Sequence, residues 1–177
     1  SSDVLEKIVF VHQNEIMMDG QMCSLGTADA VRSCMNYFEQ YNCNDDTQVL
    51  ILSGDVPFID IQQLTLFSRM TNSIMISKTT KPAGYGRVFL NEDGNLSSIV
   101  EHALCDETQL LCNRVNAGLY NLSVRLLKET IPHIVFNLRK QEFLLTDFYL
   151  FTDKKISCFC IPLVPKNVNT LTDLQSI

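Results

Sequence analysis

No stretch of the sequence approaches the roughly 18 consecutive apolar residues that a membrane-spanning helix requires. The first residues, SSDVLEKIVFVHQNE, carry acidic side chains and lack both the basic start and the long apolar centre of a secretory signal. The chain also lacks internal repeats and low-complexity linkers. We therefore expect one domain with no membrane segment and a cytoplasmic location, since 177 residues suffice for one substantial core.

Basic residues are few: 14 lysines and arginines stand against 20 aspartates and glutamates, for a net charge of -6. A non-specific nucleic-acid binder normally presents a basic surface, so we expect no nucleic-acid partner. The seven cysteines include no CxxC pair, which favours buried, reduced thiols over zinc ligands or disulfides. The N-x-[ST] matches at Asn95 and Asn121 are then chance occurrences in a protein of a reducing compartment.

Apolar strands alternate with amphipathic helices along the chain, which predicts an α/β fold with a doubly wound, mostly parallel, Rossmann-like sheet. Strands are expected at 7–11, 48–52, 73–77, 117–122 and 156–163. Helices are expected within 25–41, 60–70, 123–132, 145–154 and 170–177. Asp60 is a candidate N-cap of the second helix, and Thr146 or Asp147 of the fourth. Asp93-Gly94 predicts an antiparallel hairpin inserted midway, because glycine accepts the positive φ of such turns.

Polar residues follow the ends of several predicted strands. The apolar run VLIL ends in Ser53-Gly54-Asp55, Glu101 follows SSIV, and Asn116 precedes AGLY. Ligands of a doubly wound sheet bind beyond the carboxyl ends of its strands, and an accessible aspartate near phosphates suits Mg²⁺. Each signal alone also fits a turn or a solvated strand end.

Taken in order, seven motifs are more specific. They are QMCSLGTADAV (21–31), LSGDVPFI (52–59), PAGYGRV (82–88), IVEH (99–102), VNAGLY (115–120), QEFLLTD (141–147) and NVNTL (167–171). In this order they resemble the sugar-1-phosphate nucleotidyltransferases, in particular the uridyltransferase (pyrophosphorylase) domain of bacterial bifunctional N-acetylglucosamine-1-phosphate uridyltransferases. The resemblance spans nearly the whole chain.

The resemblance implies a Mg²⁺-dependent enzyme that converts UTP and N-acetylglucosamine-1-phosphate to UDP-N-acetylglucosamine and pyrophosphate. It implies in-line attack on the α-phosphorus, with no general base or nucleophile from the protein. By the resemblance, the nucleotide contacts are Gln21, Gly26, Thr27, Ser53, Gly54 and Asp55, with Gln21 and the Gly26-Thr27 pair reading uracil. The sugar contacts are Gly86, Glu101, Asn116 and Asn169, and the metal ligands are Asp55 and Asn169. A homo-oligomer is compatible with the sequence.

The main departure from the family pattern is the absence of a first strand and a glycine-rich loop of the type L-A-A-G-x-G-T-R-M. We therefore expect residues 1–177 to be an N-terminally incomplete nucleotidyltransferase domain that begins near the third strand. Ser53 also replaces a residue often aromatic in the relatives, and GTADA replaces GTGHA. Two alternatives stay open: a nucleotidyltransferase for another sugar, alcohol phosphate or base, and a non-catalytic nucleotide-sugar-binding remnant of the family.

Overall fold

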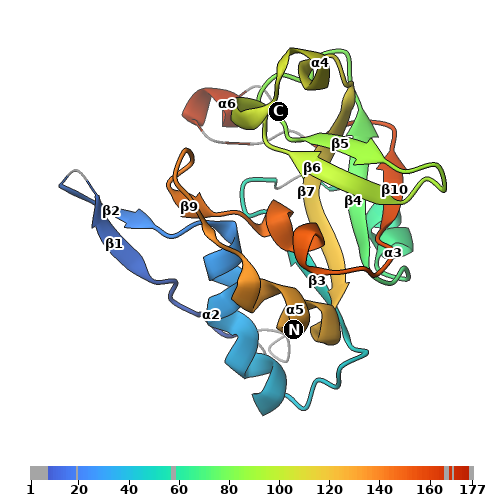
Figure 1. Cartoon of the computed structure of the whole chain (residues 1–177). Helices are drawn as coiled ribbons and strands as arrows, with labels where there is room; N and C mark the ends of the chain where they lie inside the picture. Colours follow the sequence, from blue (N-terminus) through green and yellow to red (C-terminus); the bar gives the residue numbers. More distant parts are fainter. Residues whose placement is uncertain (1–7, 19, 57–58, 166–167, 169, 176–177) are drawn as a thin grey trace.

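The computed structural model describes residues 8–18, 20–56, 59–165, 168 and 170–175. A six-stranded mixed sheet forms the centre, with the order β10-β4-β7-β5-β6 and with β3 also paired to β7 (Figure 1). Its strands are β3 (Gln48–Leu52), β4 (Ser73–Lys78), β5 (Arg87–Leu90), β6 (Leu96–Val100), β7 (Arg114–Ser123) and β10 (Ser157–Ile161). Two small hairpins accompany it, β1 (Glu15–Met18) with β2 (Gln21–Ser24), and β8 (Phe136–Asn137) with β9 (Glu142–Phe143).

The long strand β7 organises this sheet. It runs antiparallel to β3, β4 and β5, and β10 runs parallel to β4. The strands β3, β4, β5 and β10 therefore share one direction, and β6 and β7 run the other way. The predicted α/β class is confirmed, and β5 and β6 form the predicted antiparallel hairpin around Gly94, whose φ is 79°.

Helices cover both faces of the sheet, as alternating side chains along β4 and β7 require. The α-helices are α2 (Thr27–Gln40), α3 (Ile61–Phe67), α4 (Glu107–Leu110), α5 (Val124–Thr130) and α6 (Leu171–Gln175). Three 3₁₀ helices complete the set, η1 (His102–Leu104), η2 (Ile131–His133) and η3 (Leu145–Phe151). Within the described part of the chain, none of these helices is long and apolar enough to cross a membrane.

Two apolar clusters fill the spaces between the sheet and these helices. On one face, Ile74 and Ile76 of β4 pack with α2, α5 and η3. On the other face, Met75 of β4 packs with Phe67 of α3. Successive residues of β4 therefore point to opposite faces of the sheet, and both faces are covered. Burial on both sides is what the continuous apolar sequence of this strand predicted.

Three local expectations need correction. The predicted strand at 7–11 is wrong over its described part, because residues 8–14 form no strand and have no neighbouring strand to pair with. The helix predicted within 145–154 is the 3₁₀ helix η3, which covers residues 145–151 and follows Leu144, and neither Thr146 nor Asp147 caps it. The cysteines are free thiols as expected, but they are half-buried or, at Cys160, exposed rather than buried.

Asn121 fastens β7 to the end of α3. Its side chain is 1% exposed, and its amide nitrogen donates to the carbonyls of Phe67 (3.2 Å), Ser68 (3.3 Å) and Met70 (2.7 Å). Phe67 is the last residue of α3, and Ser68 and Met70 follow it, so this one amide supplies a partner to carbonyls at and just beyond the helix end, where intrahelical partners are lacking. A side chain so buried is also closed to glycosylation.

We expect Asn121→Ala to lower the free energy of unfolding by about 2 kcal/mol, because buried carbonyls lose their donor. Urea unfolding of the purified chain measures this difference. Asn36→Ala on the exposed face of α2 is the matched control, with an expected change below about 0.5 kcal/mol. Equal effects of the two substitutions would contradict the structural role of Asn121.

Candidate functional site

The N-terminus of α2 is held against β9 by a close backbone approach. Gly26 is buried, with a φ of 94°, and a Cβ added to it would lie 2.5 Å from Cβ of Glu142 and 2.8 Å from the carbonyl oxygen of Phe143. The amide of Phe143 donates to the carbonyl of Leu25 at 2.8 Å. Glycine is therefore required at position 26 both by conformation and by space.

Thr27, the first residue of α2, joins this helix to η3. Its hydroxyl oxygen accepts a hydrogen bond from the amide of Leu145 at 3.0 Å. The first backbone amides of a helix favour anionic or carbonyl groups of a ligand. Gly26 and Thr27 thus form the adjacent pair at a helix start that the sequence predicted for the nucleotide side.

The two glutamines near this helix start differ in position. Gln21 is exposed at the turn end of the β1-β2 hairpin, where it pairs with Met18, and the hairpin projects away from α2 (Figure 1). The uracil-reading role predicted for Gln21 stays a prediction. Gln13 lies beside Gly26, because its side-chain amide donates to the carbonyl of Gly26 at 2.6 Å.

The sequence carried a signal for this hairpin that the motif comparison passed over. Asp19-Gly20 stands between Met17-Met18 and Gln21-Met22, and an Asp-Gly pair between such segments is typical of a tight hairpin turn. Gly20 has a φ of 82°, as such a turn requires. The hairpin at 15–24 separates Gln13 from Gly26 along the chain and leaves them in contact in space.

Asp55 follows β3 at the point where a distant segment returns. The hydroxyl of Ser53 donates to its carboxylate oxygen Oδ1 at 2.5 Å. Its carbonyl accepts from the amide of Val168 at 2.8 Å, so the segment near the C-terminal end lies beside Asp55. Asn169, the second predicted metal contact, falls outside the described residues.

Three of the four predicted sugar contacts lie together, and the fourth, Asn169, falls outside the described residues. A Cβ at Gly86 would lie 3.7 Å from both carboxylate oxygens of Glu101, and the backbone amide of Asn116 donates to the carbonyl of Gly86 at 2.9 Å. Thr146 belongs to the same group, because its hydroxyl donates to Oε1 of Glu101 at 2.9 Å. From the sequence, Thr146 is a candidate helix cap and part of the motif QEFLLTD, but it is not among the predicted site residues.

A bulge in β7 sets the direction of Asn116. The register of β7 against β4 shifts between Ile74 and Ile76, and Gly118 in this part of β7 has a φ of 76°. The carboxamide of Asn116 accepts from the amide of Gly118 (3.1 Å) and donates to the hydroxyl of Tyr120 (2.7 Å). Bulges redirect side chains next to sites, and this one fixes both ends of the Asn116 amide.

Negative charge concentrates around Glu101. Burial, with the nearby charge of Glu101, raises the pKa of the Asp147 carboxyl above its ordinary value. Burial likewise raises the pKa of Glu142. The charge of Lys140 lowers this pKa, and the charge of Glu101 adds to the increase. Carboxylates that share a half-buried region in this way are suited to accept hydrogen bonds from sugar hydroxyls.

A cavity of about 500 Å³ lies between α2 and β3. Val31, Cys34 and Phe38 of α2 line it, with Val49 and Ile51 of β3. Its lining also includes Thr27, Ser53 and Gly54, three of the predicted nucleotide contacts, together with Gly118. Residues 53–54 after β3, the start of α2 and the bulge of β7 therefore border one space.

A divalent metal ion near Asp55 would have to bind through only one or two protein side chains. Within the described residues, no group of three or more histidines, cysteines, aspartates or glutamates could hold a metal ion. Mg²⁺ commonly uses one or two carboxylates, with water and substrate phosphates as its remaining ligands. The half-buried carboxylate of Asp55 meets that smaller requirement.

Comparison with known proteins identifies the family. The family profile described as "Nucleotidyl transferase" matches residues 4–150, and the chain belongs to this family. It is 32% identical over 154 residues to the "Bifunctional protein GlmU" of Picosynechococcus sp., an alignment that covers 84% of this chain and 33% of the relative. It is 30% identical over 181 residues to the "Probable UDP-N-acetylglucosamine pyrophosphorylase" of Acanthamoeba polyphaga mimivirus, covering 94% of this chain and 69% of that protein.

Solved structures share the fold. HddC from Yersinia pseudotuberculosis superposes with a TM-score of 0.59 at 19% identity, over 86% of this chain and 60% of that one. The chain therefore spans about a third of the bacterial bifunctional relative and somewhat over half of the solved chain.

We expect Gly26→Ala to destabilise the protein more than Gly94→Ala does. Both glycines have a positive φ, and that strain alone costs about 1–2 kcal/mol. Only at Gly26 must the new methyl group also displace Glu142 and the backbone of Phe143, whereas nothing lies within 4 Å of a Cβ at Gly94. Urea unfolding of both variants measures the difference, and equal losses of stability would show that β9 does not hold the start of α2.

Proposed function

We propose that the chain is a Mg²⁺-dependent uridyltransferase that forms UDP-N-acetylglucosamine and pyrophosphate from UTP and N-acetylglucosamine-1-phosphate. The convergence of Gly86, Glu101 and Asn116 supports this proposal most strongly. These residues lie just before β5, just after β6 and within β7, and the family resemblance implies an amino-sugar contact for all three. The name of the mimivirus relative, "Probable UDP-N-acetylglucosamine pyrophosphorylase", agrees with this product.

On the nucleotide side, we assign the base to the start of α2. Uracil presents both hydrogen-bond donors and acceptors, which a carboxamide and backbone amides can match. We assign the carboxamide role to Gln13 rather than Gln21, because Gln13 contacts Gly26 and Gln21 lies at the hairpin turn. Thr27 and Gly26 would supply the backbone groups.

On the sugar side, Glu101 and Asn116 would bind hydroxyl groups, and Gly86 would offer its backbone amide. Thr146 holds the Glu101 carboxylate in place through its hydroxyl group. The bulge of β7 and Tyr120 hold the Asn116 carboxamide. These contacts orient the sugar phosphate before reaction, which is a principal contribution of the protein to this type of transfer.

Asp55 would hold Mg²⁺, with Asn169 as the proposed second ligand. When bound, the ion neutralises charge on the phosphate groups. The phosphate oxygen of the sugar then attacks the α-phosphorus of UTP in line with the departing pyrophosphate. No proton must be removed from an already ionised phosphate, so we assign no general base and no covalent intermediate. Ser53, hydrogen-bonded to Asp55, would keep the carboxylate oriented.

The experiment is a pyrophosphate-release assay over several nucleoside triphosphates and sugar phosphates, with Mg²⁺. We expect UTP with N-acetylglucosamine-1-phosphate to exceed the other pairs by at least about tenfold in kcat/KM. We expect Gln13→Leu to lower kcat/KM for UTP by about tenfold or more, since a base edge loses its partner. Gln21→Leu is the matched control and should leave it within about twofold.

Activity with CTP alone would refute the proposed base. Loss of activity in Gln21→Leu but not in Gln13→Leu would return the base contact to Gln21. Binding of UDP-N-acetylglucosamine by calorimetry without any turnover would favour the non-catalytic alternative, a nucleotide-sugar-binding module.

A further inference from the structure

Arg87 is the largest fully buried side chain of the protein. It is 1% exposed, and no salt bridge to a carboxylate joins it within the described residues. A buried guanidinium is costly unless hydrogen bonds compensate for its lost hydration. Its partners therefore indicate which parts of the structure require this side chain.

Two of these partners are carbonyls of the loop that precedes β5. The nitrogen Nη1 of Arg87 donates to the carbonyl of Pro82 at 2.6 Å and to the carbonyl of Tyr85. The amide of Tyr85 also donates to the carbonyl of Pro82, so the loop closes on itself around Gly84, whose φ is 86°. The guanidinium group thus fixes the backbone that leads directly into Gly86.

The third partner lies next to Glu101. The nitrogen Nη2 of Arg87 donates to Nδ1 of His102 at 3.3 Å. Arg87 also pairs through its backbone with Val100 of β6 and Val115 of β7. One residue therefore connects the loop before Gly86 to the segment that carries Glu101.

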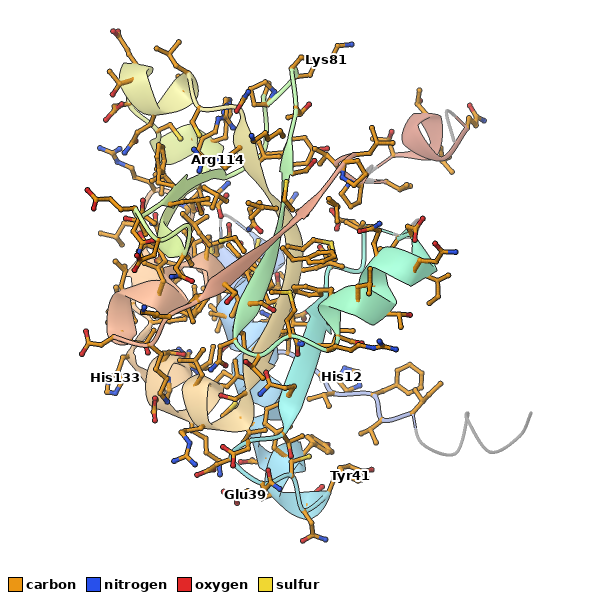
Figure 2. The ribbon with its side chains drawn as sticks, turned by 90° about the vertical axis from the view of Figure 1, so that its right-hand side faces the viewer. His12, Glu39, Tyr41, Lys81, Arg114 and His133 are labelled. Atoms are coloured by element: carbon orange, nitrogen blue, oxygen red, sulfur yellow. The ribbon has the colours of Figure 1, made fainter. Side chains whose placement is uncertain are left out.

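The loop held in this way is largely exposed to solvent. It connects β4 to β5, and Figure 2 shows Lys81, on this loop, at the outer end of the molecule, opposite Glu39 and Tyr41 at the end of α2. Lys81, Ala83 and Gly84 are exposed. A loop of this kind would have to become ordered when a ligand binds, and the loss of conformational freedom would lower affinity.

We propose that Arg87 is a positioning residue that holds the Gly86 backbone and the Glu101 side chain at a fixed separation, so that the sugar side of the site is formed before the ligand arrives. This inference rests on the proposed function. It assigns Arg87 no contact with the ligand. The residue acts through Pro82 and Tyr85 on one side and through His102 on the other.

A purely structural arginine would have different consequences. Its loss would lower stability and weaken every ligand by a similar factor. A positioning residue affects the part of the ligand that meets Gly86 and Glu101, which is the sugar. UDP, which lacks the sugar, therefore serves as the internal reference for UDP-N-acetylglucosamine.

The test compares Arg87→Lys with the wild-type 177-residue chain. Lysine keeps the charge, but its single ammonium group cannot reach the two loop carbonyls and His102 as the planar guanidinium does. Calorimetry measures the Kd of UDP and of UDP-N-acetylglucosamine, and hydrogen–deuterium exchange measures opening of segments 82–86 and 101–105. Arg69→Lys, exposed at the end of α3, is the matched control.

We expect Arg87→Lys to weaken UDP-N-acetylglucosamine about tenfold and UDP by less than about twofold. Exchange should rise in both segments together and stay unchanged in the Arg69→Lys control. An equal weakening of both ligands, or no change in either, would overturn the inference. So would faster exchange in only one of the two segments.

Failure of the proposed function gives a different result. A wild-type chain that binds neither UDP nor UDP-N-acetylglucosamine refutes the uridyltransferase proposal. The exchange measurement then decides alone whether Arg87 couples the two segments. Arg87→Met, which removes the charge, is a second variant, and a cooperative thermal unfolding transition is required of each variant before its affinities are compared.

Discussion

The pairing of β7 with three other strands is the constraint on which the site depends. Because β7 runs antiparallel to β3, β4 and β5, it brings the carboxyl end of β3 and the start of β5 to the same strand. The backbone amide of Asn116 in β7 donates to the carbonyl of Gly86, and the bulge near Gly118 lies two residues further on. The side chain of Asn116 is fixed by hydrogen bonds to Gly118 and Tyr120. In a regular strand without the bulge, we expect Asn116 to lack these two bonds.

Much of the fold could be predicted because local signals agreed with the tertiary structure. Asp60 caps α3 as expected, with its carboxylate accepting from the amides of Gln62 (2.8 Å) and Gln63 (3.0 Å). Asp93-Gly94 marks the β5-β6 hairpin, and the apolar runs in β3 and β4 mark buried strands. The family motifs identified Gly86, Glu101 and Asn116, which the structure brings together, although their roles remain proposals.

The sequence was least informative where tertiary contacts decide which residues meet. The β1-β2 hairpin stands between Gln13 and Gly26 along the chain, yet the two residues are joined by a hydrogen bond. Threonine is a common helix-capping residue, but the hydroxyl of Thr146 donates a hydrogen bond to Glu101, which is distant in sequence. Residues 8–11 are mostly apolar, as in a buried strand, but they do not pair with a strand of the described structure. The coupling of Arg87 to His102 leaves no pattern in sequence, because it depends on burial and register.

The central claim, that one site binds a uridine nucleotide at the start of α2 and an amino sugar at Gly86 and Asn116, is tested most directly by NMR titration of the ¹⁵N-labelled chain. UDP-N-acetylglucosamine should shift the amide resonances of Gly26, Thr27, Gly86 and Asn116 at one common Kd. UDP should shift those of Gly26 and Thr27 and leave Gly86 and Asn116 nearly unchanged. Shifts confined to other parts of the protein, or identical shifts with both ligands, would contradict the account.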